Sequence, residues 1–281
     1  MKIFTITDYL ESLAPLSLQE SYDNSGLLTG QSSWECTGVI TTMDATEEVV
    51  MEAVNKNCNL VVAHHPIIFS GLKRINGMNY VERAIIAAIK HDISIYAIHT
   101  NLDNVLTGVN GIIADKLGLI NRSVLQSRTR ILKAHPYEDL AYDLIATENT
   151  QSETGSGLIG ELEKPLKEEE FLELVKVSFG LPLIRHTPML GKNARRIAVC
   201  GGAGSFLIGS ARDAGADFYL TADVKYHEFF DADSRLVIAD IGHFESEQFT
   251  ISYLFDILTL KFPNFAVQKT GVRTNPVHYF L

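Results

Sequence analysis

Short apolar runs alternate with segments of helical periodicity along most of this chain, and the alternation limits the folds that it can adopt. In the first half, the runs that predict strands are 37–44, 58–66 and 93–103, and helices are predicted at 8–15, 45–57, 79–92 and 108–119. After residue 195, strands are predicted at 195–200, 216–223, 235–242 and 265–270, with helices at 201–215, 224–233 and 243–262. Apolar strands separated by helices indicate βαβ units. The predicted fold class is therefore α/β, with largely parallel sheets.

The alternation is interrupted between about residues 121 and 195. This part of the chain predicts a strand at 139–146, a polar loop at 147–157 and a helix at 164–180, which Gly180 ends. A length of 281 residues exceeds the usual size of one domain. We predict two α/β lobes, residues 1–130 and 131–281, with the C-terminal segment able to pack back on the first lobe.

The composition excludes several classes of protein. The formal net charge of -10 makes nucleic-acid binding unlikely, because phosphate recognition needs a basic face. The three cysteines, Cys36, Cys58 and Cys200, form neither a disulfide framework nor a thiolate metal site, and suit a reducing compartment. No apolar run is long enough to span a bilayer, and the N-terminus lacks the features of a signal peptide. We expect a cytoplasmic protein without a membrane partner.

Imidazoles and carboxylates follow the predicted strands at the point where each strand ends. In open α/β sheets, ligands bind beyond the carboxyl ends of the strands. The candidate metal ligands there are His64, His65, Asp103, His243 and Glu247. Three nitrogens and two carboxylates suit zinc, iron, manganese, cobalt or nickel, and five ligands are too many for one tetrahedral zinc. The set predicts two divalent metal ions per chain, with open positions.

Each of these motifs also has a purely structural interpretation. His243 and Glu247 lie four residues apart on one helix face, where they can bind metal or simply hydrogen-bond to each other. The doubled histidine precedes Pro66, which holds His65 extended, so the two imidazoles can diverge to two ions or can both be structural. Asp103 can form a turn or cap the following helix.

Further polar residues near the strand ends are candidates for other roles. His99, Asp223 and His227 can move protons, although each can equally be a core, capping or surface residue. Gly202, Gly204 and Ser205 follow a strand and can present backbone amides to an anion. That segment is not a full dinucleotide fingerprint and lacks the lysine of a P-loop, so an ordinary tight turn is the alternative.

Several motifs follow one another along the chain in a fixed order: SYDNSGLLTG, VVAHHPIIF, IHTNLDNVLTGVN, HPYEDLAYDL, VCGGAGS, TADVKYHEF and GHFESE. In combination, they resemble the Nif three-like proteins, a dinuclear-metal family often labelled GTP cyclohydrolase 1 type 2 homologues. The resemblance runs over nearly the whole chain from Ser21. One departure is Tyr22, where Trp is more usual in the family.

The resemblance implies two interlinked α/β lobes with a two-metal site in the cleft between them. All five candidate ligands match the family motifs, and Glu247 would bridge both ions. His65 and Asp103 would complete the ligand set of one ion, and His64 and His243 that of the other. The resemblance also implies a toroidal homohexamer.

Two functions are consistent with this site. The first is a metal-dependent hydrolase that acts on a small nucleotide or phosphoester, of the GTP cyclohydrolase 1 type 2 kind. The alternative is a non-catalytic metal-binding protein, such as a regulatory scaffold or a metal chaperone.

Overall fold

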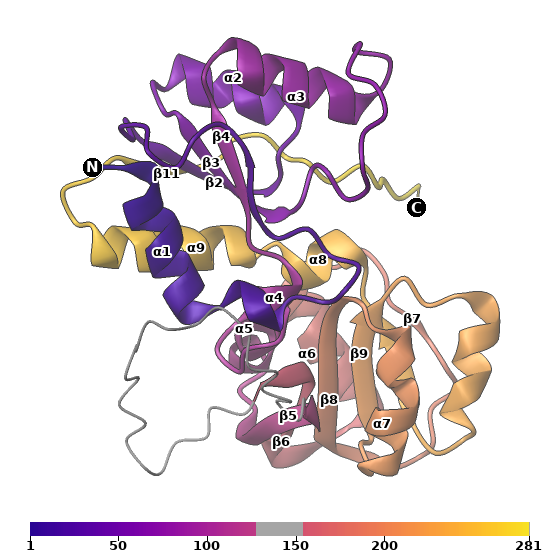
Figure 1. Ribbon diagram of the computed structural model, residues 1–281. Helices are drawn as coiled ribbons and strands as arrows, with labels where there is room; N and C mark the ends of the chain where they lie inside the picture. The colour runs from indigo at the N-terminus through magenta and orange to yellow at the C-terminus, as the bar shows by residue number, and fades with distance from the viewer. Residues whose placement is uncertain (128–153, 281) are drawn as a thin grey trace, which may run out of the picture.

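Two β-sheets, one in each lobe, organise the residues that the structure describes, 1–127 and 154–280 (Figure 1). The structure is a computed structural model. One sheet has the strand order β1-β4-β3-β2-β11, and the other has the order β5-β6-β8-β9-β10-β7. The predicted α/β fold class is confirmed. Within the described ranges, no helix is long and apolar enough to cross a membrane.

The five-stranded sheet is parallel except at one edge. Its parallel strands are β2 (Val39–Asp44), β3 (Leu60–His65), β4 (Ser94–Ala97) and β11 (Val267–Lys269), and β1 (Gly26–Thr29) is antiparallel to β4. Helices α2 (Glu47–Asn55) and α3 (Tyr80–Lys90) cover one face. Helices α1 (Ile3–Leu13) and α9 (Thr250–Lys261) cover the other, so both faces of these apolar strands are buried.

The six-stranded sheet is mixed. Its parallel strands are β8 (Asn193–Ala203), β9 (Phe218–Ala222) and β10 (Val237–Asp240), and its antiparallel strands are β5 (Ile120–Ser127), β6 (Gly155–Lys167) and β7 (Arg185–His186). Helices α5 (Val109–Lys116) and α6 (Glu168–Phe179) pack on one face. The 3-10 helices η2 (Ser205–Leu207) and η3 (Tyr226–Ala232) and helix α7 (Ile208–Asp213) contribute to the core on the other.

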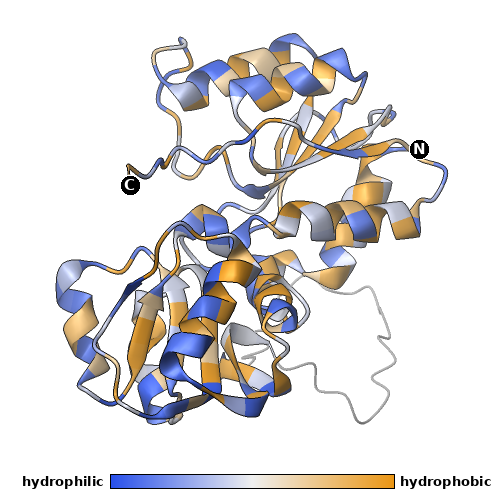
Figure 2. Ribbon diagram, turned by 180° about the vertical axis from the view of Figure 1, so that it is seen from behind, coloured by the Kyte–Doolittle hydropathy of each residue, from blue (hydrophilic) through white to orange (hydrophobic). Residues whose placement is uncertain are grey.

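The chain passes between the lobes more than once. Strand β5 already belongs to the six-stranded sheet, and β11 returns to pair with β2 in the five-stranded sheet. One hydrophobic cluster contains residues of both sheets, among them Val62 and Val199. Figure 2 shows hydrophobic residues concentrated on the strands and on the inner sides of the helices. The predicted boundary near residue 130 lies outside the described residues, and the division into lobes 1–130 and 131–281 stays a prediction.

Several elements differ from the sequence-based expectation. Helix α1 begins at Ile3 and not at residue 8, because Ile3, Ile6 and Leu10 recur at helical spacing and are all buried. The predicted loop 147–157 ends within β6, whose polar, glycine-containing start pairs with β5. The strand conformation of such a segment depends on its pairing with neighbouring strands, which the periodicity of its own residues does not reveal. The predicted strand 139–146 lies outside the described residues.

Candidate metal centre

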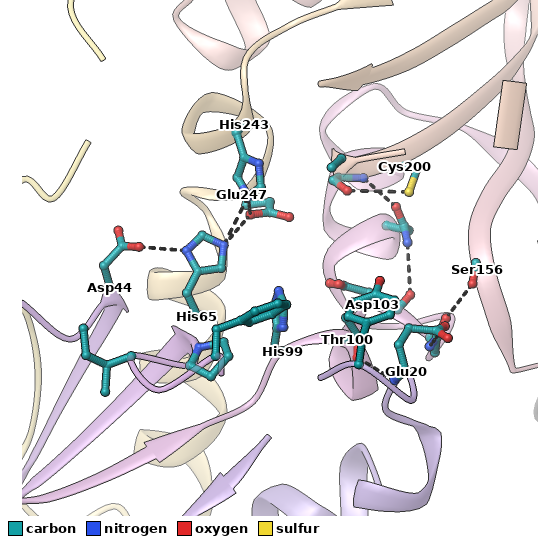
Figure 3. Close-up of a pocket in the computed structure, with 18 of the residues that line it drawn as sticks. Glu20, Asp44, His65, His99, Thr100, Asp103, Ser156, Cys200, His243 and Glu247 are labelled. Carbon is teal, nitrogen blue, oxygen red and sulfur yellow. Dashed lines mark hydrogen bonds and ion pairs between the residues drawn. The ribbon is translucent and has the colours of Figure 1, made fainter. Parts of the chain in front are cut away.

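The carboxyl ends of three strands bring the predicted ligands together. His64 and His65 end β3, and His65 is the register partner of Asp44 at the end of β2. Asp103 ends the short helix α4 (Thr100–Asp103) after β4, and the short helix α8 (His243–Glu247) follows β10 of the other sheet. His65, Asp103, His243 and Glu247 line a cleft of about 460 Å³ with residues of both lobes (Figure 3), whereas His64 is fully buried. Tertiary structure therefore places all five candidate ligands at one point.

His64, Asp103 and Glu247 form the first half of the cluster. The Nε2 atom of His64 lies 3.7 Å from Oδ1 of Asp103 and 3.8 Å from Oε1 of Glu247. Both distances are too long for a hydrogen bond. His64 Nε2 and Asp103 Oδ1 are buried atoms with no hydrogen-bond partner. Buried polar atoms almost always have a partner, so these two atoms fit the ligands of a cation between them.

His65, His243 and Glu247 form the second half. The Oε2 atom of Glu247 lies 3.0 Å from His65 Nε2 and 3.1 Å from His243 Nε2, and the two Nε2 atoms are 3.3 Å apart. Glu247 thus directs one oxygen to each half. The pairing differs from the one that the family resemblance implied, because the structure brings His64 to Asp103 and His65 to His243.

The three histidines are oriented by hydrogen bonds on their opposite ring nitrogens. His64 Nδ1 donates to the carbonyl oxygen of Ile98 at 2.8 Å, and His65 Nδ1 donates to Asp44 at 2.8 Å. His243 Nδ1 donates to Asp223 at 2.7 Å. Because these partners are acceptors, each Nδ1 carries a proton and Nε2 is the ring nitrogen that faces the cluster, where loss of its own proton would free a lone pair for a metal. This is the tautomer that binds a metal.

The electrostatics of the cluster favour positive charge. Burial lowers the pKa of His65, but its hydrogen bonds with Asp44 and Glu247 outweigh burial and raise the pKa to about 9. Burial likewise opposes the charged form of His243, but its bonds with Asp223 and Glu247 raise the pKa to about 11. Burial and repulsion by Glu247 raise the pKa of Asp103 to about 7. A bound cation would relieve that repulsion.

Sequence reasoning missed two carboxylates that support the cluster. Asp44 orients His65, and Asp23 accepts a hydrogen bond of 2.7 Å from Nδ1 of His99. Asp44 is the last residue of a predicted strand, so an inspection of every strand end would have found it. Asp23 precedes β1 and follows no strand, so only the fold brings it to His99.

The remaining predicted residues divide into two groups. His99 lines the cleft, whereas Asp223 holds a histidine of the cluster in place. The structure does not bring His227 to the cleft: it is exposed on η3, in contact with the rings of Tyr226 and Phe230.

The glycine-containing segment has structural contacts of its own, and the anion site predicted there stays a prediction. The amide of Gly202 donates to Ser246 Oγ at 3.0 Å and lies inside β8. The carbonyl of Gly204 accepts the hydroxyl of Tyr219 at 2.7 Å, and Ser205 begins η2. A Cβ atom at Gly202 would lie 2.4 Å from Oε1 of Glu247. Gly202 therefore provides room for the carboxylate that both halves of the cluster share.

Replacing Asp44 with asparagine is expected to weaken metal binding at the His65 half by roughly 10- to 100-fold, because the imidazole loses the carboxylate that fixes its tautomer and raises its basicity. Competition with a chromophoric chelator measures this affinity. The same substitution at Asp213, an exposed residue of α7, is the control and should leave the affinity unchanged. Equal affinities of the two variants would contradict the supporting role of Asp44.

The fold and the cluster together define an α/β protein with a candidate metal centre between two lobes. The model of the Duf34/NIF3 family (NGG1p interacting factor 3) matches residues 1–276, and the chain belongs to this family. This confirms the resemblance that the motifs indicated.

Relatives and solved structures agree with this assignment. A Clostridium perfringens protein named GTP cyclohydrolase 1 type 2 homolog is 33% identical over 88% of this chain and 87% of its own length. A protein of the same name from Clostridium acetobutylicum is 30% identical over 98% and 94%. The crystal structure of a Staphylococcus aureus hypothetical protein has a TM-score of 0.88 and 32% identity, covering 100% of this chain and 99% of that one. A Bacillus cereus protein related to NIF3 has a TM-score of 0.85 and 28% identity, with the same coverage.

Proposed function

We propose that this protein is a metal-dependent hydrolase that holds two divalent ions per chain and acts on a small nucleotide or phosphoester. The observation that carries the proposal is the position of Glu247. Its two carboxylate oxygens approach two separate groups of ligands, and its side chain is only 3% exposed. The ions would be zinc, iron, manganese, cobalt or nickel, because imidazole and carboxylate ligands together suit these metals.

Bound ions would lower the pKa of a water molecule and so supply a nucleophile at neutral pH. The chain's own residues position the ligands and limit access. His64 is fully buried, whereas His65 and His243 are partly open to the cleft, with side chains 23% and 37% exposed. Substrate can therefore reach the His65 half of the cluster from the cleft.

His99 is the best-placed group for moving a proton. Asp23 holds its Nδ1, so its Nε2 remains available for exchange. The ring centroid of His99 lies 5.3 Å from that of His64 and 5.5 Å from that of His65. We therefore assign proton transfer to His99. Asp223, which was also a candidate for proton transfer, is assigned the orientation of His243.

The proposal is tested by replacing His99 with glutamine. Wild-type protein loaded with metal should hydrolyse a member of a panel of nucleotides and phosphoesters. The His99→Gln variant should keep its metal content and lose roughly 10²- to 10⁴-fold in turnover. His91→Gln, an exposed histidine after α3, is the control and should behave as wild type.

A different result would favour the alternative function. If the protein binds two ions, hydrolyses nothing in the panel and passes metal to or recruits another protein, it is a metal chaperone or a regulatory scaffold. The homohexamer and the cytoplasmic location stay predictions, and light scattering of the purified protein measures the former.

A further inference from the structure

Exposed aromatic rings from both lobes line the cleft beside the metal centre. Tyr22 and Phe69 come from the lobe of the five-stranded sheet, and Phe206 comes from η2 of the other lobe. Tyr22 and Phe206 are each 61% exposed, although burial of such rings is strongly favourable. The rings of Tyr22 and Phe69 lie 6.2 Å apart, and Phe69 meets His99 edge to face at 6.3 Å. Aromatic surface therefore extends from Tyr22 to the metal centre.

Apart from the histidines, which would be neutral as metal ligands, the charged side chains among the described lining residues are carboxylates. Glu20, Asp44, Asp103 and Glu247 line it, and none of its described lining residues is Lys or Arg. Two divalent ions would bring four positive charges, and the carboxylates of Asp44, Asp103 and Glu247 already balance three of them. A triphosphate chain would add several further negative charges, with no Lys or Arg among the described lining residues to receive them.

A second, smaller cleft does not change this balance. It has a volume of about 350 Å³ and shares Asp44, His65 and His243 with the first. Its arginine, Arg185, is paired with the buried carboxylate of Asp240 and donates to the carbonyl oxygen of Val224. Arg185 is therefore already neutralised by a partner from its own lobe.

We propose that the cleft selects a small planar aromatic or heteroaromatic compound that carries at most one phosphate group, and discriminates against nucleoside triphosphates. This inference rests on the proposed function, because the reacting group of the compound lies at the metal centre while its ring stacks on the aromatic side chains. A volume of about 460 Å³ is enough for one such molecule.

The first test compares ligands on metal-loaded wild-type protein by calorimetry. GMP should bind at least about tenfold more tightly than GTP, because the two share one ring and only the extra phosphates of GTP meet the carboxylates of the cleft. Phenyl phosphate should bind at least about tenfold more tightly than glycerol phosphate, since one stacked ring contributes about that factor. Metal content is measured after each titration to confirm that no ligand has removed the ions. GTP binding as tight as GMP binding, or equal affinity for the two phosphate esters, would overturn the proposal.

The second test removes one ring. Phe206→Ala should weaken phenyl phosphate binding about tenfold and leave glycerol phosphate binding unchanged. Phe230→Ala is the matched control, because Phe230 is 69% exposed and lies outside both clefts. Equal effects of the two variants on the affinity for phenyl phosphate would contradict the assignment of Phe206 as a stacking residue. A wild-type protein that binds no metal would instead refute the proposed function, so the two failures are distinguishable.

Discussion

Glu247→Gln is expected to remove both metal ions from the protein. The side chain keeps its shape, but it loses the negative charge and presents an amide NH₂ group where a second carboxylate oxygen had pointed. Because Oε1 approaches the His64 half and Oε2 the His65 half, neither half keeps its ligand set. Elemental analysis of protein purified in the presence of metal should fall from about two ions per chain to nearly none, and hydrolysis should be lost with them.

Glu245→Gln is the matched control for this substitution. Glu245 is on the same helix and is also buried, but it accepts a hydrogen bond from Asn275 instead of facing the histidines. A glutamine can retain that bond through its carbonyl oxygen, so the metal content should stay at the wild-type value. If Glu247→Gln keeps two ions, Glu247 is not the shared ligand and the proposed centre is wrong.

Gly202→Ala is expected to damage both the metal centre and the fold. Gly202 has a φ of +61°, and an added Cβ would lie 2.4 Å from Oε1 of Glu247. The carboxylate must move, so metal content should fall sharply. In metal-free protein, urea unfolding should show a loss of about 2 kcal/mol or more, from backbone strain together with the clash.

A second glycine separates these two effects. Gly180 ends α6 with a φ of +64°, and a Cβ there would meet nothing within 4 Å. Gly180→Ala should therefore cost about 1 kcal/mol from backbone strain alone and leave the metal content unchanged. Equal metal content in the two variants would show that Glu247 does not need the space at Gly202.

The fold class could be predicted from the sequence because its buried parallel strands are continuous apolar runs. The strands that end in His65 and Asp240 were predicted for this reason. Strands β5 and β6 were missed, since their polar and glycine-containing segments are held by pairing with β8 and with each other, and not by periodicity.

The candidate ligands could be predicted because the carboxyl ends of parallel strands share one edge of a sheet, and the histidines and carboxylates that follow those ends can be read from the sequence. The division of these ligands into two groups could not be predicted. The division of His64 with Asp103 from His65 with His243 depends on side-chain directions and on the contact between lobes. The supporting hydrogen bond from His99 to Asp23 joins residues 76 positions apart.

The sequence by itself determined the alternation of strands and helices, and the residue types at the strand ends. Tertiary structure alone decided that two sheets would bring those ends together from opposite lobes. Strand and helix periodicity is a local property of the chain, whereas the orientation of each imidazole depends on partners such as Asp44 and Asp223. The doubled histidine is explained only at that level: one imidazole, fully buried, faces Asp103, and the other faces His243 across the cleft.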